Sequence, residues 1–136
     1  MSLSQVDRLS ALLLARTISN SHASMDFRGE LDRNLRRLYS YKVFALSEIA
    51  EMSNLSVHQV KQRIRWSKDD EFSPRGGVAV RHLDHLTLMV ADKEFAKNNF
   101  IALEEDGASR SALARVLGVS HRTLTRWAEE QEENAN

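Results

Sequence analysis

The sequence contains no cysteine, which excludes a disulfide framework, a thiolate metal site and a thiol nucleophile. It has only one proline and 7% aromatic residues, a composition that favours a mostly helical protein. The N-terminus lacks a basic region, and its longest apolar run, 11–15, is too short for a secretory signal or a membrane span. We therefore expect a soluble protein of the cytoplasm that has no membrane partner.

The formal net charge is zero, whereas many small nucleic-acid-binding proteins are plainly basic. The charge is unevenly distributed, however. The segment 33–66 has seven Lys or Arg against two Glu, a net charge of +5, and 67–109 has nine Asp or Glu against five Lys or Arg. Four more glutamates lie in 129–133. A neutral chain of this kind can still present a locally basic face to phosphate.

Signatures of catalysis are missing. There is no glycine-rich phosphate loop, no nucleophile elbow and no pair of carboxylates in an apolar context. His82 and His85 are three residues apart, but no third ligand stands at a recognisable metal spacing, so we expect surface or partly buried histidines. The sequence predicts no enzyme, metal, cofactor or small-molecule ligand.

The most regular pattern lies in 109–127, which reads S-R-S-A-L-A-R-V-L-G-V-S-H-R-T-L-T-R-W. Ala114 is followed four residues later by Gly118 and ten residues later by Leu124. Two short helices that cross steeply need a small residue where their axes approach and a turn residue that tolerates positive φ. Ser120 suits the N-cap of the second helix. The other residues expected in this small core are Leu113, Leu117, Val119 and Trp127.

The stretch 45–65 repeats this pattern at an offset of 64 residues. Ala50 is followed four residues later by Asn54 and ten residues later by Val60, and the serine N-cap recurs at Ser56. Asparagine is tolerated in a left-handed turn, whereas Ser53 is polar where the second copy has leucine. A repeat of one supersecondary unit predicts two units of the same architecture.

Both copies resemble the helix-turn-helix of bacterial and bacteriophage transcription regulators. Two such units in a chain of this size resemble small immunity repressors or Cro-like regulators of temperate phages, which implies a bacterial or phage-infected host cell. The resemblance implies that 56–65 and 120–127 are recognition helices. Their outward Arg, Lys, Gln, His, Thr and Val are suited to contact phosphates and base edges. The residues expected to contact DNA are Ser56, Val57, His58, Gln59, Lys61, Gln62, Arg65, Ser120, His121, Arg122, Thr123, Thr125 and Arg126.

The polar segment between the two units, 69–81, contains the only proline and a Gly pair. Three interpretations stay open: a plain connection, a short wing formed with Val78–Val80, or an arm that places Arg75 in the minor groove. Leu83, Leu86, Val90 and the apolar residues of 95–103 are expected to form one or two helices that end at Gly107.

The N-terminal segment 1–20 predicts an amphipathic helix, followed by a polar break at Asn20–Ser24. This helix either packs on the following domain or mediates a homodimer. Asp26 is expected to cap a helix from Phe27 to about Tyr41 that buries Phe27, Leu31, Leu35 and Leu38. Trp66 and Trp127 are expected to end the two recognition helices and to close their cores. The inward stripe of the first helix contains Leu3, Val6, Leu9 and Leu13 and can extend to Leu14 and Ile18.

The predicted architecture is all-α, with two small helical domains that each contain a helix-turn-helix. The expected boundaries are an N-terminal helix at 1–20, domains at 26–68 and 82–130, a linker or wing at 69–81 and an acidic tail at 131–136. The expected function is sequence-specific binding of a bipartite double-stranded operator and transcriptional repression. One alternative is a DNA-recruiting module of a packaging, recombination or transposition complex. Another is a protein-interaction adaptor in which one unit no longer binds DNA.

Overall fold

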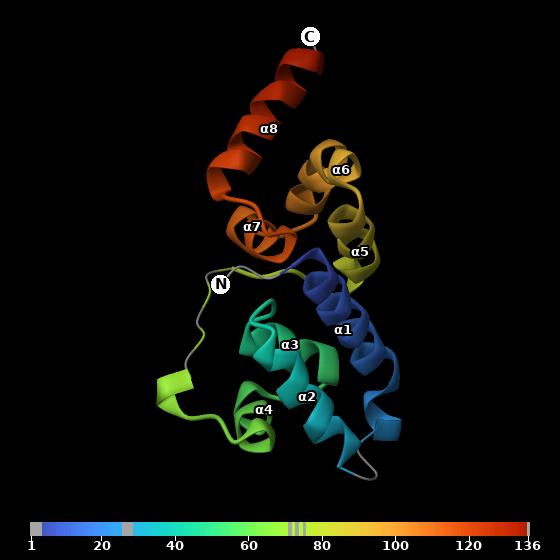
Figure 1. The fold of residues 1–136 in the computed structure, drawn as a ribbon, viewed down its shortest axis with the longest axis vertical. Coiled ribbons are helices and arrows are strands. Elements are labelled where there is room, and N and C mark those ends of the chain that lie inside the picture. Colours follow the sequence, from blue (N-terminus) through green and yellow to red (C-terminus); the bar gives the residue numbers. More distant parts are fainter. Residues whose placement is uncertain (1–3, 26–28, 71, 73, 75, 136) are drawn as a thin grey trace.

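The predicted all-α fold is confirmed. The computed structural model describes residues 4–25, 29–70, 72, 74 and 76–135, and these residues form helices and no strand. Figure 1 shows α1–α4 in one half of the molecule and α5–α8 in the other, with α1 lying beside α5. The helices are α1 (Gln5–Met25), α2 (Glu30–Ser40), α3 (Leu46–Ser53), α4 (Val57–Ile64), α5 (Leu83–Ala91), α6 (Lys93–Glu105), α7 (Arg110–Leu117) and α8 (His121–Ala135), with 3₁₀ turns η2 (Lys68–Asp70) and η3 (Val80–His82).

The first helix, α1, is uninterrupted over 21 residues. The predicted polar break at Asn20–Ser24 is therefore wrong. Ile18 and Met25, two turns apart, are both buried, and this packing outweighs the weak helix propensity of the intervening polar residues. The predicted inward stripe is also wrong in part, because Val6 and Leu13 are 70% and 53% exposed. The buried residues of α1 are Ala11, Leu12, Ala15, Ile18 and Met25, with Leu9 and Leu14 partly buried.

The second helix, α2, follows Gly29, which has a left-handed backbone with φ of 69° and forms the N-cap without a side-chain bond. The predicted cap Asp26 and the predicted first residue Phe27 lie outside the described residues, as does Leu3 of the N-terminal stripe. The prediction that α2 buries its leucines is confirmed. These are Leu31, Leu35 and Leu38, which are at most 2% exposed.

Two helix pairs stand where the repeat predicts them, α3 with α4 and α7 with α8. Asn54 ends α3 with φ of 56° and Gly118 ends α7 with φ of 73°, so the predicted left-handed turns are confirmed. The small residues Ala50 and Ala114 are buried. Both pairs therefore have the local geometry that their sequence spacing predicts.

The final helix, α8, is longer than predicted. It passes Trp127, which is buried inside the helix and does not end it, and it continues to Ala135. The segment 131–135, expected as part of an acidic tail, is therefore helical. The short wing, one of the three interpretations left open for 69–81, is not seen, since Val80 lies in η3 and the described residues contain no strand.

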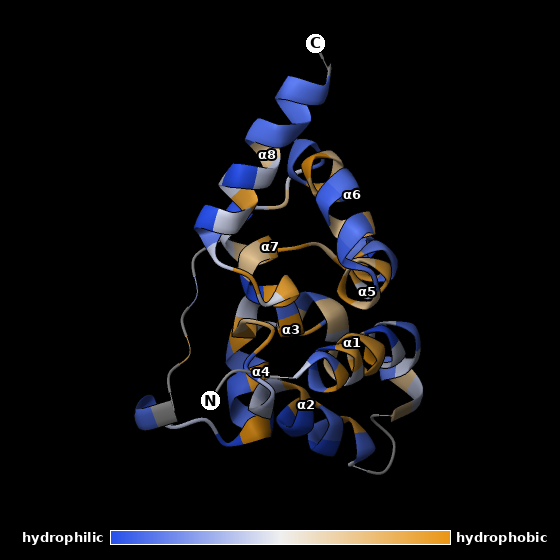
Figure 2. Cartoon of the chain, turned by 45° about the horizontal axis from the view of Figure 1, so that its top comes forward, coloured by the Kyte–Doolittle hydropathy of each residue, from blue (hydrophilic) through white to orange (hydrophobic). Residues whose placement is uncertain are grey.

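The buried apolar side chains form one connected core that extends across both halves. α1 packs against α2 and α3 on one side and against α5 on the other, so it joins the two predicted domains. Figure 2 shows apolar segments of α1, α3, α5 and α7 near the middle of the molecule, whereas the end of α8 is hydrophilic. Within the described residues, no helix combines the length and the apolar character that crossing a membrane requires.

Candidate nucleic-acid interface

The first predicted recognition helix, α4, begins with a capping box. The Ser56 hydroxyl accepts a hydrogen bond from the Gln59 amide at 3.1 Å, and the Gln59 side-chain carbonyl accepts one from the Ser56 amide at 2.9 Å. These bonds satisfy two donors at the start of the helix. The predicted capping by Ser56 is confirmed. Gln59, expected to read a base, instead uses its side-chain oxygen within the helix.

The outward side of α4 is open to solvent. His58 and Gln62 are exposed, and their side chains make no hydrogen bond or ion pair with another described residue. Lys61 is half-buried, and its ammonium lies 4.3 Å from the centre of the Trp66 ring in a cation–π contact. Val57 and Arg65, the other predicted contacts, are also exposed.

Trp66 lies beside this surface and is only half-buried, so it covers the core from its edge. Its indole nitrogen is shielded from solvent and has no acceptor among the described residues. A cavity of about 310 Å³ separates its ring from the end of α2, and Arg36, Lys42 and Arg65 line this cavity together with Tyr39. The three cations give this end of the first half a basic surface.

The second predicted recognition helix, α8, is capped by Ser120, as predicted. The Ser120 hydroxyl accepts a hydrogen bond from the Thr123 amide at 3.0 Å and lies 2.9 Å from the Thr123 hydroxyl. Thr125 donates its hydroxyl to the carbonyl of His121. The two threonines expected to contact bases are therefore half-buried and engaged within the helix. The residues that remain exposed at the start of α8 are His121, Arg122 and Arg126.

The second half of α8 has the opposite charge. Glu129, Glu132 and Glu133 are exposed. Glu130 pairs with Lys97 of α6 at 2.5 Å, and this hydrogen bond raises the pKa of the Lys97 ammonium and lowers the pKa of the Glu130 carboxyl. The sequence of the helix is thus cationic where it begins, near the turn, and anionic toward its end. Figure 2 shows that this end is hydrophilic.

Figures 1 and 2 show α4 and the start of α8 on the same side of the molecule, with α1, α5 and α6 on the other side. The connection that carries η2 loops out on the side of α4 and α8. Arg75, the residue expected to reach the minor groove, lies outside the described residues. The fold therefore places α4 and the start of α8 on one side of the molecule.

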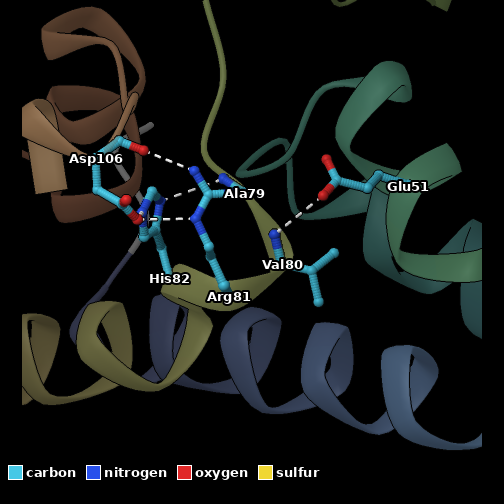
Figure 3. Close-up of polar contacts among 6 residues, drawn as sticks. All are labelled: Glu51, Ala79, Val80, Arg81, His82 and Asp106. Atoms are coloured by element: carbon cyan, nitrogen blue, oxygen red, sulfur yellow. Dashed lines mark hydrogen bonds and ion pairs between the residues drawn. The ribbon is translucent and has the colours of Figure 1, made fainter.

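The end of the connection forms a polar junction between the two halves (Figure 3). The Val80 amide donates to a Glu51 carboxylate oxygen on α3 at 3.4 Å, and Arg81 donates through Nε to Oδ2 of Asp106, just after α6, at 2.8 Å. His82 is buried, with Nε2 2.7 Å from the same Asp106 oxygen and Nδ1 3.4 Å from the Ala79 amide. The expectation of a surface or partly buried His82 is wrong, whereas His85 is exposed.

The geometry of His82 indicates a structural role. Asp106 is acceptor-only when ionised, so His82 donates through Nε2, and Nδ1 is then left to accept from the Ala79 amide. Neither ring nitrogen is free to take a proton from a substrate. In the described part of the chain, no three His, Asp or Glu side chains gather as metal ligands.

Replacing Asp106 by asparagine is expected to lower the Tm at neutral pH and to remove an acid-dependent contribution to stability. Hydrogen bonds, first from Arg81 and then from His82, hold the pKa of Asp106 below its usual range. A carboxyl with a depressed folded-state pKa stabilises the fold above its unfolded pKa, and this contribution is lost as the pH falls through the folded pKa. The difference in Tm between the two proteins should therefore shrink below about pH 4.

Thermal unfolding followed by circular dichroism between acidic and neutral pH measures this effect. Asp69→Asn is the control, because Asp69 is exposed in η2 and its side chain has no bond to another described residue. A Tm difference for D106N that stays constant from neutral to strongly acidic pH would show that the charge of Asp106 does not stabilise the junction.

Sequence reasoning missed the residues of the interior junction. Glu48 is 3% exposed and pairs with Arg115 of α7 at 2.8 Å, and Arg8 of α1 donates to the carbonyl of Arg115 at 2.7 Å. One local signal was present for Glu48, because it stands three residues after Ala45 at the position of a capping-box glutamate. No protein-family model, curated protein or solved structure matches the chain.

Proposed function

We propose that the chain is a sequence-specific double-stranded DNA-binding protein that acts as a transcriptional repressor. In this mechanism α4 and α8 each enter the major groove and together read a bipartite operator. Cations at the helix edges contact phosphates and position the protein, while polar side chains on the outward faces contact base edges. Occupation of a promoter then excludes RNA polymerase.

The observation that carries this proposal is the duplicated helix pair. In both copies a left-handed residue, Asn54 or Gly118, leads to a serine N-cap, Ser56 or Ser120. The helix that follows buries one face in the core and leaves the other exposed. A short helix that presents unengaged polar and cationic side chains beside a tight turn is suited to the major groove.

The position of the two helices supports joint binding. Because α4 and the start of α8 lie on one side, a single chain can present both to one duplex without rearrangement. Tethered binding of this kind gains affinity, since the second helix docks at high effective concentration once the first has bound. The basic cavity near Arg36 and Arg65 provides additional positive charge beside α4.

Alanine substitutions on both helices test the proposal. Arg122→Ala and Arg126→Ala on α8, and Lys61→Ala and Gln62→Ala on α4, are each expected to weaken specific binding by about 1–3 kcal/mol. The site is first selected from a random duplex pool, and affinities are then measured by fluorescence anisotropy at fixed salt. Arg16→Ala is the matched control, because it removes an exposed cation of α1 that pairs with a carboxylate of α5, and both of these helices lie on the other side of the molecule.

Different results contradict different parts of the proposal. Failure to bind any duplex at low salt would exclude DNA binding. Loss of affinity in the α8 variants alone would leave a DNA-binding protein with one recognition helix and would refute the bipartite mechanism. An equal loss in Arg16→Ala would show that only overall charge matters.

The acidic half of α8 favours a second candidate, a DNA-recruiting module of a larger packaging, recombination or transposition complex. Glu129, Glu132 and Glu133 extend along an exposed helix beyond the core, where they are available to a basic partner protein. In that case specific DNA binding persists, but promoter repression is absent and the activity of the complex requires a partner nuclease or recombinase. A reporter assay with the selected site upstream of a promoter distinguishes the two.

A further inference from the structure

A buried carboxylate on α3 connects the two halves of the molecule. Glu48 is 3% exposed, and its two oxygens accept two hydrogen bonds and form one ion pair. The Ala45 amide donates at 2.7 Å and the Val78 amide of the interhelical connection at 2.8 Å, while Nη1 of Arg115 on α7 lies 2.8 Å from one carboxylate oxygen. One side chain of the first half thus holds both the connection and a helix of the second half.

The guanidinium of Arg115, which pairs with this carboxylate, does not have all of its hydrogen-bond donors satisfied. Nη1 of Arg115 donates to the carbonyl of Val43, in the loop between α2 and α3. Nε and Nη2 are shielded from solvent, yet neither has an acceptor among the described residues. Buried ion pairs are weak contributors to stability compared with apolar packing, and their best-attested use is to fix one register. A guanidinium with two unsatisfied nitrogens fits that use.

Other polar contacts restrain the same junction. Arg8 of α1 donates to the carbonyls of Arg115 and Val116 at 2.7 and 3.3 Å, which fastens the end of α7 to the helix that crosses both halves. Glu51, one turn after Glu48, accepts from the Val80 amide (Figure 3). All of these bonds are directional, so they restrict rotation of α7 relative to α3 more than apolar contacts do.

We infer that the Glu48–Arg115 pair sets the separation and rotation of α8 relative to α4, so that the protein reads only DNA sites whose two halves have one fixed spacing. The inference rests on the proposed function. Each helix follows directly from the helix that carries a member of the pair, α4 from α3 and α8 from α7. A fixed pair of helices meets both half-sites at one spacing, whereas a flexible pair tolerates several.

The DNA test uses the full chain and the duplex selected from a random pool, with spacer base pairs inserted between its two halves. Insertion of about five base pairs turns the second half to the opposite side of the duplex and is expected to reduce wild-type affinity about a hundredfold. Arg115→Met should bind the selected duplex more weakly than the wild type does. Insertion of the base pairs should then reduce its affinity by less than about tenfold. Arg110→Met is the control, because Arg110 pairs with Glu104 inside the second half.

A second measurement does not depend on DNA. The natural chain has no cysteine, so spin labels at Glu30→Cys on α2 and Glu129→Cys on α8, both exposed positions, report the distance between the halves. The distance distribution should be narrow in the wild type and in Arg110→Met, and broader in Arg115→Met. Arg8→Ala, which removes the bonds to the end of α7, should also broaden it and provides a test if Arg115→Met does not fold.

The outcomes separate the inference from the proposed function. A wild-type protein that selects bipartite sites but accepts all spacings equally overturns the inference and leaves the proposed function intact. Folded Arg115→Met and Arg8→Ala proteins with wild-type spacing preference and narrow distances also overturn it. If no duplex is selected, the proposed function and the fixed-spacing inference are both wrong, and the label distances then show only what holds the two halves together.

Discussion

Replacement of Glu48 by alanine is expected to lower the free energy of unfolding by about 3–5 kcal/mol. The substitution leaves the Arg115 guanidinium, whose side chain is 12% exposed, without its counter-charge. It also removes the acceptor of the Ala45 and Val78 amides. Urea unfolding at neutral pH, followed by circular dichroism, measures the loss.

The matched control is Glu104→Ala. Glu104 also pairs with an arginine, Arg110, but these side chains are 19% and 29% exposed and remain in contact with water. Exposed ion pairs contribute about 0–1 kcal/mol, so this variant should remain close to that range. Equal losses in the two variants would show that burial of Glu48 is not the source of its effect.

A double variant separates stability from specificity. In Glu48→Leu with Arg115→Met, neither charge is left unpaired, and apolar replacement of a buried pair is often neutral or stabilising. We expect this protein to recover part of the stability lost in Glu48→Ala, while the amides of Ala45 and Val78 still lack their acceptor. If the ion pair fixes the position of α8 relative to α4, the double variant should regain stability but should still bind sites of different half-site spacing with similar affinity.

Features that depend on neighbouring residues could be predicted from the sequence. Asn54 and Gly118 adopt left-handed turns, and Ser56 and Ser120 cap the helices that follow. These outcomes follow from positive φ and from a hydroxyl within reach of an amide three residues on. The repeat offset also placed the buried apolar residues of both pairs, because the same helix geometry requires them at the same spacing. The buried residues that correspond at this offset include Ile49 with Leu113 and Val60 with Leu124.

Features that depend on distant residues could not be predicted in this way. Glu48 and Arg115 are 67 residues apart, and nothing near either residue indicates that they meet. The leucines of α1 lie on several faces of the helix, so periodicity did not show that Leu12 is buried and Leu13 exposed. That choice depends on where α2, α3 and α5 pack. An outward position on the helix also did not distinguish free side chains from those that hydrogen-bond to the backbone of the same helix or its N-cap. Gln59 and Thr125 form such bonds.

Replacement of Gly118 by alanine is expected to cost about 2–3 kcal/mol, of which roughly 1–2 kcal/mol comes from the left-handed backbone. The rest comes from Arg8. A Cβ at position 118 would lie 2.4 Å from Nε and 2.5 Å from Cζ of Arg8, so the guanidinium would have to leave the carbonyl of Arg115. Thermal and urea unfolding measure the total.

Asn54 provides the comparison, because it occupies the matching turn of the first pair with φ of 56°. Asn54→Gly should change stability by no more than about 0.5 kcal/mol, since relief of the left-handed strain is offset by greater freedom of the unfolded chain. When Arg8 is already replaced by alanine, Gly118→Ala should lower the free energy of unfolding only by the contribution of the left-handed backbone. The two substitutions act on one contact, so their effects are not additive. A full cost in that background would mean that Arg8 does not hold the end of α7 and that the turn is limited by its backbone alone.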